Sequence, residues 1–175
     1  MLGMRIRRPM ALVTVVAVAA LVAVAAPACS SSSSTASPTF TKGITVFFTA
    51  SGAHAPKLPS SFVNCVNGKL PAGDRATIGT LTSSSDSSKL PDAAGVRLTR
   101  AADQCNANLT NQLIEASAFA GAPSSISAAQ KTCATGKIIS GLAGLDDAKL
   151  KGSNTNTVQT AVSNALKACG VSLGG

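Results

Sequence analysis

The four cysteines in the last two thirds of this chain constrain its fold more than any other feature, because they form two pairs with similar spacing and similar neighbours. Cys65 and Cys105 have 39 residues between them, and Cys133 and Cys169 have 35. The segments that begin at the first cysteine of each pair are CVNGKL and CATGKI. The segments that end at the second cysteine are TRAADQC and SNALKAC. This similarity indicates an internal repeat.

The repeat predicts which cysteines pair with each other. Its units span about residues 59–118 and 124–175, and each unit contains one pair, so we expect the disulfides Cys65–Cys105 and Cys133–Cys169. Each disulfide would join two helices of one unit. Four cysteines can pair in three ways, and two unrelated disulfides in a domain without a repeat are the alternative. A closed loop of this length stabilises a fold by about 4 kcal/mol.

Metal binding is the competing use of four cysteines. The sequence contains no Cys-x-x-Cys segment, and its one histidine, His54, lies far from every cysteine. Structural zinc sites usually bring two ligands close together in the sequence, and redox dithiols use a similar short spacing. We therefore predict no metal site, no redox pair and no cofactor.

Apolar residues recur at intervals of three and four along most of the region from residue 59 onward, which predicts an all-α fold. The expected helices cover residues 60–70, 92–118, 124–133 with a continuation to 142 left open, and 155–169. Gly170 follows the last of them, as is common after a helix. The sequence thus predicts a small bundle of about four main helices, arranged as two disulfide-pinned helical hairpins in tandem.

Residues 40–58 interrupt this pattern. The segment FTKGITVFFT, from Phe40 to Thr49, is rich in β-branched and aromatic residues, which favours a strand or a short extended arm. A loop with several glycine, alanine and proline residues follows it. The Ser-rich stretch 74–91 has room for a short helix around Ile78 and Leu81, followed by a flexible loop.

Residues 1–28 have the layout of an export signal. Three arginines precede an uncharged apolar run from Met10 to Ala26. Small residues then lead to Cys29, and five serines follow it. A basic start, a short apolar run and a small-residue cleavage site are typical of a secretory signal peptide.

Cys29 directly after this segment resembles the modified cysteine of bacterial lipoproteins. The resemblance implies a lipid on Cys29, a Ser-rich tether over residues 29–39, and anchoring to the outer face of the cytoplasmic membrane. Lipidation of Cys29 would also leave an even number of cysteines for disulfides. A soluble secreted protein and an uncleaved membrane anchor are the alternatives, and the export route, general or twin-arginine, stays open.

The charge of the mature chain gives no sign of nucleic-acid binding. Residues 29–175 carry 12 basic and 7 acidic residues, a net charge of +5, and the basic residues form no run. The chain has no tryptophan and no tyrosine to stack on bases. We expect no nucleic-acid partner.

Residues suited to catalysis are few. His54 could act as a general base beside a carboxylate, Asp146 and Asp147 could hold a cation weakly, and Glu115 lies in the predicted helix 92–118. We expect these side chains to be solvated, and the sequence contains none of the common catalytic or nucleotide-binding motifs.

The function that these observations favour is that of a lipid-anchored cell-envelope protein, a non-enzymatic binding or structural module. A carrier of an apolar ligand or lipid is the alternative, with Phe40, Phe47 and Phe48 covering the mouth of a cavity. A secreted enzyme that depends on His54 or on a carboxylate is the second alternative. An envelope protein and an apolar ligand are the expected kinds of partner, and the oligomeric state stays open.

Overall fold

The computed structural model describes residues 35–49, 56–83, 86, 90–120, 122–147, 150 and 155–171, with Thr155 and Asn156 described by their backbone alone. The predicted signal peptide (1–28), the proposed lipidation site Cys29 and His54 lie outside these residues. The helices belong to one compact unit, Ser31–Gly175.

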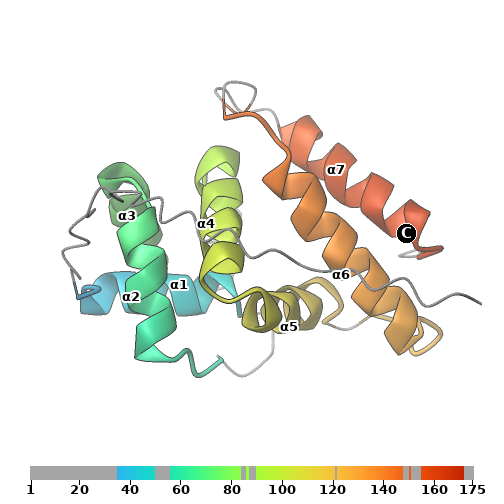
Figure 1. The fold of residues 1–175 in the computed structure, drawn as a ribbon, viewed down its shortest axis with the longest axis horizontal. Helices are drawn as coiled ribbons and strands as arrows, with labels where there is room; N and C mark the ends of the chain where they lie inside the picture. Colours follow the sequence, from blue (N-terminus) through green and yellow to red (C-terminus); the bar gives the residue numbers. More distant parts are fainter. Residues whose placement is uncertain are drawn as a thin grey trace, which may run out of the picture. The chain divides into compact units, whose positions relative to one another are not determined.

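The predicted all-α fold is confirmed. The described residues form seven helices and no strand (Figure 1). The helices are α1 (Pro38–Phe47), α2 (Ser60–Lys69), α3 (Ala72–Gly79), α4 (Asp92–Cys105), α5 (Ala107–Ala118), α6 (Ala128–Ala143) and α7 (Thr155–Ala168). The sequence had predicted about four main helices, because α1 reads as a strand and α4 and α5 read as one helix.

The prediction of an extended arm over residues 40–58 is wrong where α1 forms. Helix α1 also includes the last two residues of the predicted tether, 29–39. Ser37 caps the helix by accepting a hydrogen bond from the Phe40 amide at 3.1 Å. Phe40, Ile44 and Phe48 lie four residues apart and are buried, so they share one helical face. This periodic apolar face outweighs the β propensity of the segment.

The N-terminal helix α1 packs closely against α3. A Cβ atom added at Gly43 would lie 1.9 Å from the carbonyl oxygen of Ile78. The contact therefore depends on the absence of a side chain at this position.

The long helix predicted over residues 92–118 is divided at Asn106. The backbone of Asn106 is extended, with φ −163° and ψ 93°, and its side chain accepts a hydrogen bond from the Leu109 amide at 3.0 Å. Asparagine is a favourable N-cap residue, so Asn106 ends α4 and begins α5.

Helix α6 begins later than predicted and α7 begins where predicted. Ser127 caps α6 in a capping box with Gln130, so the helix begins at Ala128 and not near residue 124. Gly170 follows α7 with a positive φ of 65°, a conformation that glycine adopts without strain.

The helices enclose one main core and a smaller second cluster. Helix α4 lies at the centre, with contacts to α2, α3, α5 and α6, while α7 packs mainly on α6. The main core includes Phe40, Ile78 and Leu98, each almost inaccessible to solvent. The second cluster consists of Phe119, Ile126, Ala134 and Val171.

Two disulfides join these helices in the pairing that the repeat predicts. Cys65–Cys105 links α2 to α4, and Cys133–Cys169 links α6 to the end of α7. The second disulfide pins a hairpin of two consecutive helices, α6 and α7, as predicted. The first joins α2 to α4, and because α3 lies between them in the sequence, this unit is not a simple two-helix hairpin. None of the described helices has both the length and the apolar character needed to cross a bilayer.

Candidate binding surface on helix α7

Helix α7 lies beside α6 and has an inner face of small residues (Figure 1). Ala165 is buried, and Ala161 lies close to Gly141 of α6, where an added Cβ would be 3.9 Å from the alanine Cβ. Small side chains let the two helices approach closely, so the inner face of α7 is occupied by α6.

A second, apolar face of α7 borders an open groove. Val158, Val162 and Leu166 follow each other at four-residue intervals and line a cavity of about 260 Å³ together with Asp92 at the start of α4. All three apolar side chains are only half-buried. In the text below, these three residues are called the α7 strip.

Polar side chains flank the α7 strip. A cavity of about 530 Å³ on the same helix is lined by Gln159, Thr160, Ser163, Asn164 and Lys167. An apolar centre with a polar, solvent-accessible rim is the arrangement typical of protein interfaces. The α7 strip packs in part on the two hydrophobic clusters and is otherwise open to solvent. Together with its polar flank, this open part has the character of a binding surface.

The Asp92 carboxylate at the edge of the groove lacks a full set of hydrogen bonds. Its Oδ2 atom is buried and has no hydrogen-bond partner among the described residues. Buried polar atoms are nearly always satisfied by protein or water, so this oxygen is a candidate acceptor for a donor that enters the groove.

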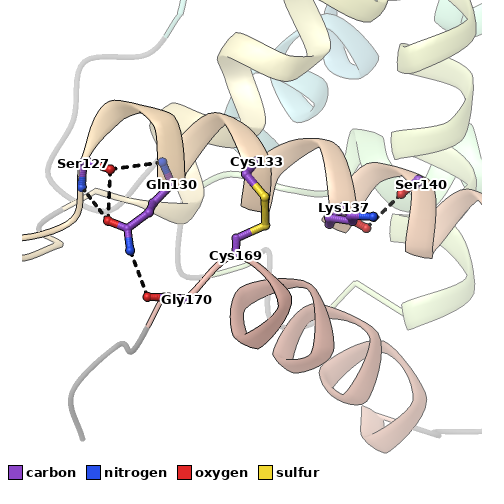
Figure 2. Close-up of a disulfide and its surroundings, with 7 residues drawn as sticks. All are labelled: Ser127, Gln130, Cys133, Lys137, Ser140, Cys169 and Gly170. Carbon is purple, nitrogen blue, oxygen red and sulfur yellow. Dashed lines mark hydrogen bonds between the residues drawn. A yellow bond between two sulfur atoms is a disulfide. The ribbon is translucent and has the colours of Figure 1, made fainter.

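The end of α7 is held to the start of α6 by a covalent bond and a hydrogen bond (Figure 2). Cys133 and Cys169 form the disulfide. Nε2 of Gln130 donates to the carbonyl oxygen of Gly170 at 2.9 Å. Both links lie where the start of α6 meets the end of α7, so they restrict the motion of the helix that bears the α7 strip.

Asp147, considered as a weak cation ligand and expected to be solvated, lies beside two arginines of α4. Oδ1 of Asp147 accepts a hydrogen bond from Arg100 at 3.1 Å, and Oδ2 lies 3.9 Å from Arg97. Arg97 also forms a two-bond contact with Asp74, at 2.6 and 2.8 Å. Asp147 thus neutralises arginines of α4.

Among the remaining predicted site residues, Glu115 is half-buried and accepts a hydrogen bond from Thr132 at 3.4 Å. The structure does not describe Cys29 or His54. In the part of the chain that it does describe, no group of three or more histidine, cysteine, aspartate or glutamate residues could hold a metal ion.

The phenylalanines of α1 do not cover the mouth of the groove on α7. Phe40 and Phe48 are each 2% exposed and belong to the main core. The ring of Phe47 contacts that of Phe48 edge to face, with centroids 5.0 Å apart. Their role in this structure is packing.

Two features of the site escaped the sequence analysis. The first is the ionic cluster of Arg97 and Arg100 with Asp74 and Asp147. The three-residue spacing of the two arginines places them on one helix face, but the aspartates that they bind lie far away in the chain. The residues of the α7 strip fit the apolar spacing of the last predicted helix, but no feature of the sequence indicates that they border a groove.

Comparison with protein-family models, curated proteins and solved structures finds no match to this chain.

Proposed function

We propose that this protein is a lipid-anchored module of the cell envelope, tethered through Cys29 to the outer face of the cytoplasmic membrane, that binds another envelope protein through the α7 strip without catalysing a reaction. The partner surface that fits best is an amphipathic helix, because three apolar side chains in helical register present a ridge that another helix can pack against.

The observation that carries the anchoring part is the use of the cysteines. Cys65–Cys105 and Cys133–Cys169 occupy four of the five cysteines. Cys29 therefore has no cysteine of the folded domain to pair with, and it follows directly after a segment with the layout of an export signal. This arrangement supports lipidation of Cys29.

The half-exposed α7 strip supports the binding part of the proposal. Val158 and Val162 would bury more apolar surface against a partner, and burial of such side chains is favourable by about 25 cal/mol for each Å² removed from water. The disulfide at the end of α7 restricts the hairpin that carries the strip, so little order would have to be gained on binding.

The native mass of the protein purified from its host tests the anchor. We expect the mass of residues 29–175, less four hydrogens for two disulfides, plus the mass of acyl groups. Substitution Cys29→Ser should abolish the acyl mass and release the protein from the membrane fraction. A native mass without acyl groups would contradict the anchor.

A cross-linking capture from envelope preparations tests the α7 strip. Ser163 is exposed beside the strip, so Ser163→Arg should block a partner without disturbing the core. Asn108→Arg, at an exposed position of α5, is the matched control. We expect one envelope protein to be captured by the wild type and the control but not by Ser163→Arg. Equal capture by all three chains would contradict the proposed surface.

Transport of an apolar ligand is the second candidate, and Asp92 is the observation that favours it. A small apolar molecule with one hydrogen-bond donor could fill the groove of about 260 Å³ and satisfy the Asp92 carboxylate. A non-covalent mass that leaves the purified protein on denaturation, and that is absent from Ser163→Arg, would favour this function over protein binding.

A further inference from the structure

The part of the mature chain that follows Cys29 contains basic residues and no acidic ones. Between residues 29 and 73 the sequence has Lys42, Lys57 and Lys69, and neither aspartate nor glutamate. All three lysines are exposed. Helices α1 and α2 both lie within this segment, so they present a positively charged surface without compensating carboxylates of their own.

Helices α1, α2 and α3 border an open hollow of about 420 Å³ with a mixed polar and apolar lining. Its polar lining consists of Thr35, Ser37, Thr39, Asn67, Arg75 and Thr80. Arg75 is the one charged residue of this lining. Lys42 and Lys69 are exposed on α1 and α2, two of the three helices that border the hollow.

The guanidinium of Arg75 has N–H donors in this hollow that its one hydrogen bond does not use. Its Nη1 donates one hydrogen bond, to the carbonyl oxygen of Asn67 at 3.2 Å. No carboxylate pairs with it within the described residues. A guanidinium carries five N–H donors in a planar fork that matches phosphate geometry, so Arg75 can hold a phosphate while it keeps its backbone contact.

The two carboxylates closest to the hollow in sequence have partners elsewhere. Asp74 binds Arg97 of α4 with two hydrogen bonds. Oδ2 of Asp86 accepts hydrogen bonds from Thr82 and Ser83. Neither residue lines the hollow, so the positive charge of Arg75 and its neighbours is not cancelled there.

We infer that this hollow and the exposed lysines of α1 and α2 form a docking surface for anionic phospholipid headgroups, with the phosphate held by Arg75. The inference rests on the proposed lipid anchor for its geometry. Thr35 lies six residues after Cys29, and six residues span at most about 20 Å, so acylation of Cys29 keeps this surface within reach of the bilayer. The surface opposite the membrane would then be free to bind a partner.

Vesicle binding by unlipidated protein tests the inference. Residues 29–175 with Cys29→Ser would be mixed with vesicles of phosphatidylcholine, with or without phosphatidylglycerol, whose negative surface potential attracts basic residues. We expect binding to the anionic vesicles alone. The substitutions Lys42→Gln and Lys69→Gln together should weaken it about 25-fold, since each basic residue near an anionic surface contributes about fivefold.

A matched pair of substitutions separates this surface from net charge. Lys131 and Lys137 both lie on α6, which packs on α4, α5 and α7. Lys131→Gln with Lys137→Gln removes the same charge and should change binding less than twofold. Equal loss from the two double variants, or equal binding to neutral and anionic vesicles, would overturn the inference.

Arg75→Gln tests the phosphate contact and should weaken binding to the anionic vesicles about fivefold or more, with an unchanged circular dichroism spectrum. Inorganic phosphate is the second probe. Saturable phosphate binding that depends on Arg75, without preference for anionic vesicles, would assign the hollow to a soluble phosphate compound and overturn the membrane assignment. Because the assay uses Cys29→Ser protein, its result does not depend on whether Cys29 is acylated in the host.

Discussion

Gln130 connects the start of α6 to the end of α7, because its Nε2 atom donates a hydrogen bond of 2.9 Å to the carbonyl oxygen of Gly170 (Figure 2). The Oε1 atom of the same side chain accepts from the Ser127 amide at 3.0 Å. One side chain therefore completes a capping box and satisfies a carbonyl beyond the last turn of α7, next to the Cys133–Cys169 disulfide.

Substitutions at Gln130 should separate these two contacts. Gln130→Ala removes both and should lower the free energy of unfolding by about 1–2 kcal/mol. Gln130→Glu keeps the acceptor of the capping box but loses the donor to Gly170, and should lower it by about half as much. Urea unfolding at pH 7 measures both values. An equal loss for the two variants would show that the capping box contributes nothing measurable.

Gly43→Ala should destabilise the fold by about 1–3 kcal/mol, as overpacking of a core does. The new methyl group would meet the Ile78 carbonyl group at 1.9 Å, and backbone atoms cannot rotate away. Gly68→Ala in α2 is the matched control, since nothing lies within 4 Å of the added carbon, and it should stabilise the protein by up to about 1 kcal/mol. Thermal unfolding of both variants distinguishes the close contact from helix propensity.

Asp74→Asn should lower the free energy of unfolding by about 2 kcal/mol, because it leaves the half-buried Arg97 without its closest carboxylate. Asp103→Asn removes one negative charge from α4, where Asp103 forms no ion pair with the described residues, and should have less than half the effect. Denaturant unfolding at low ionic strength provides the comparison.

The contribution of Arg97 to the free energy of unfolding should be constant between about pH 6 and about pH 10. Hydrogen bonding to Asp74 and the charges of Asp74 and Asp147 raise the pKa of Arg97 above its usual range, against the lowering effect of burial. A group with a raised pKa in the folded state contributes fully below its unfolded pKa and loses that contribution only as the pH rises through the folded value. A pH-dependent difference in stability between the wild type and Arg97→Met in this window would contradict this assignment.

The Cys133–Cys169 disulfide should be reduced before Cys65–Cys105. Cys133 is exposed, whereas Cys65 and Cys105 are both half-buried, and thiol–disulfide exchange requires access to a sulfur atom. Stepwise reduction with alkylation and peptide mass analysis gives the order. Labelling of Cys65 and Cys105 first would contradict it.

Loss of either disulfide should strongly lower the free energy of unfolding. The bonds join residues 40 and 36 positions apart, and loop-closure entropy assigns about 4 kcal/mol to each. The paired substitutions Cys65→Ala with Cys105→Ala, and Cys133→Ala with Cys169→Ala, should therefore lower stability by similar amounts in denaturant unfolding.

The helices that were predicted correctly are those whose local signals agree with each other. In α7, the apolar spacing, the polar start and Gly170 at the end all indicate the same element. In α1, the local signals conflict, because Thr45 and Val46 favour a strand while Phe40 and Ile44 are spaced for a helix. The conflict is decided by burial of the Phe40 face against α3, a contact between distant parts of the chain.

The sequence by itself determined the all-α class, the position of most helices and, through its repeated cysteine segments, the pairing that the structure contains. These properties follow from short-range periodicity and from an internal similarity that can be read along the chain. Tertiary structure decided the packing of Gly43 on Ile78 and the association of Asp74 with Arg97. It also decided which apolar residues of α7 stay half-exposed. Each of these depends on which helices meet in space, and that is set by the total free energy of packing and not by any local segment.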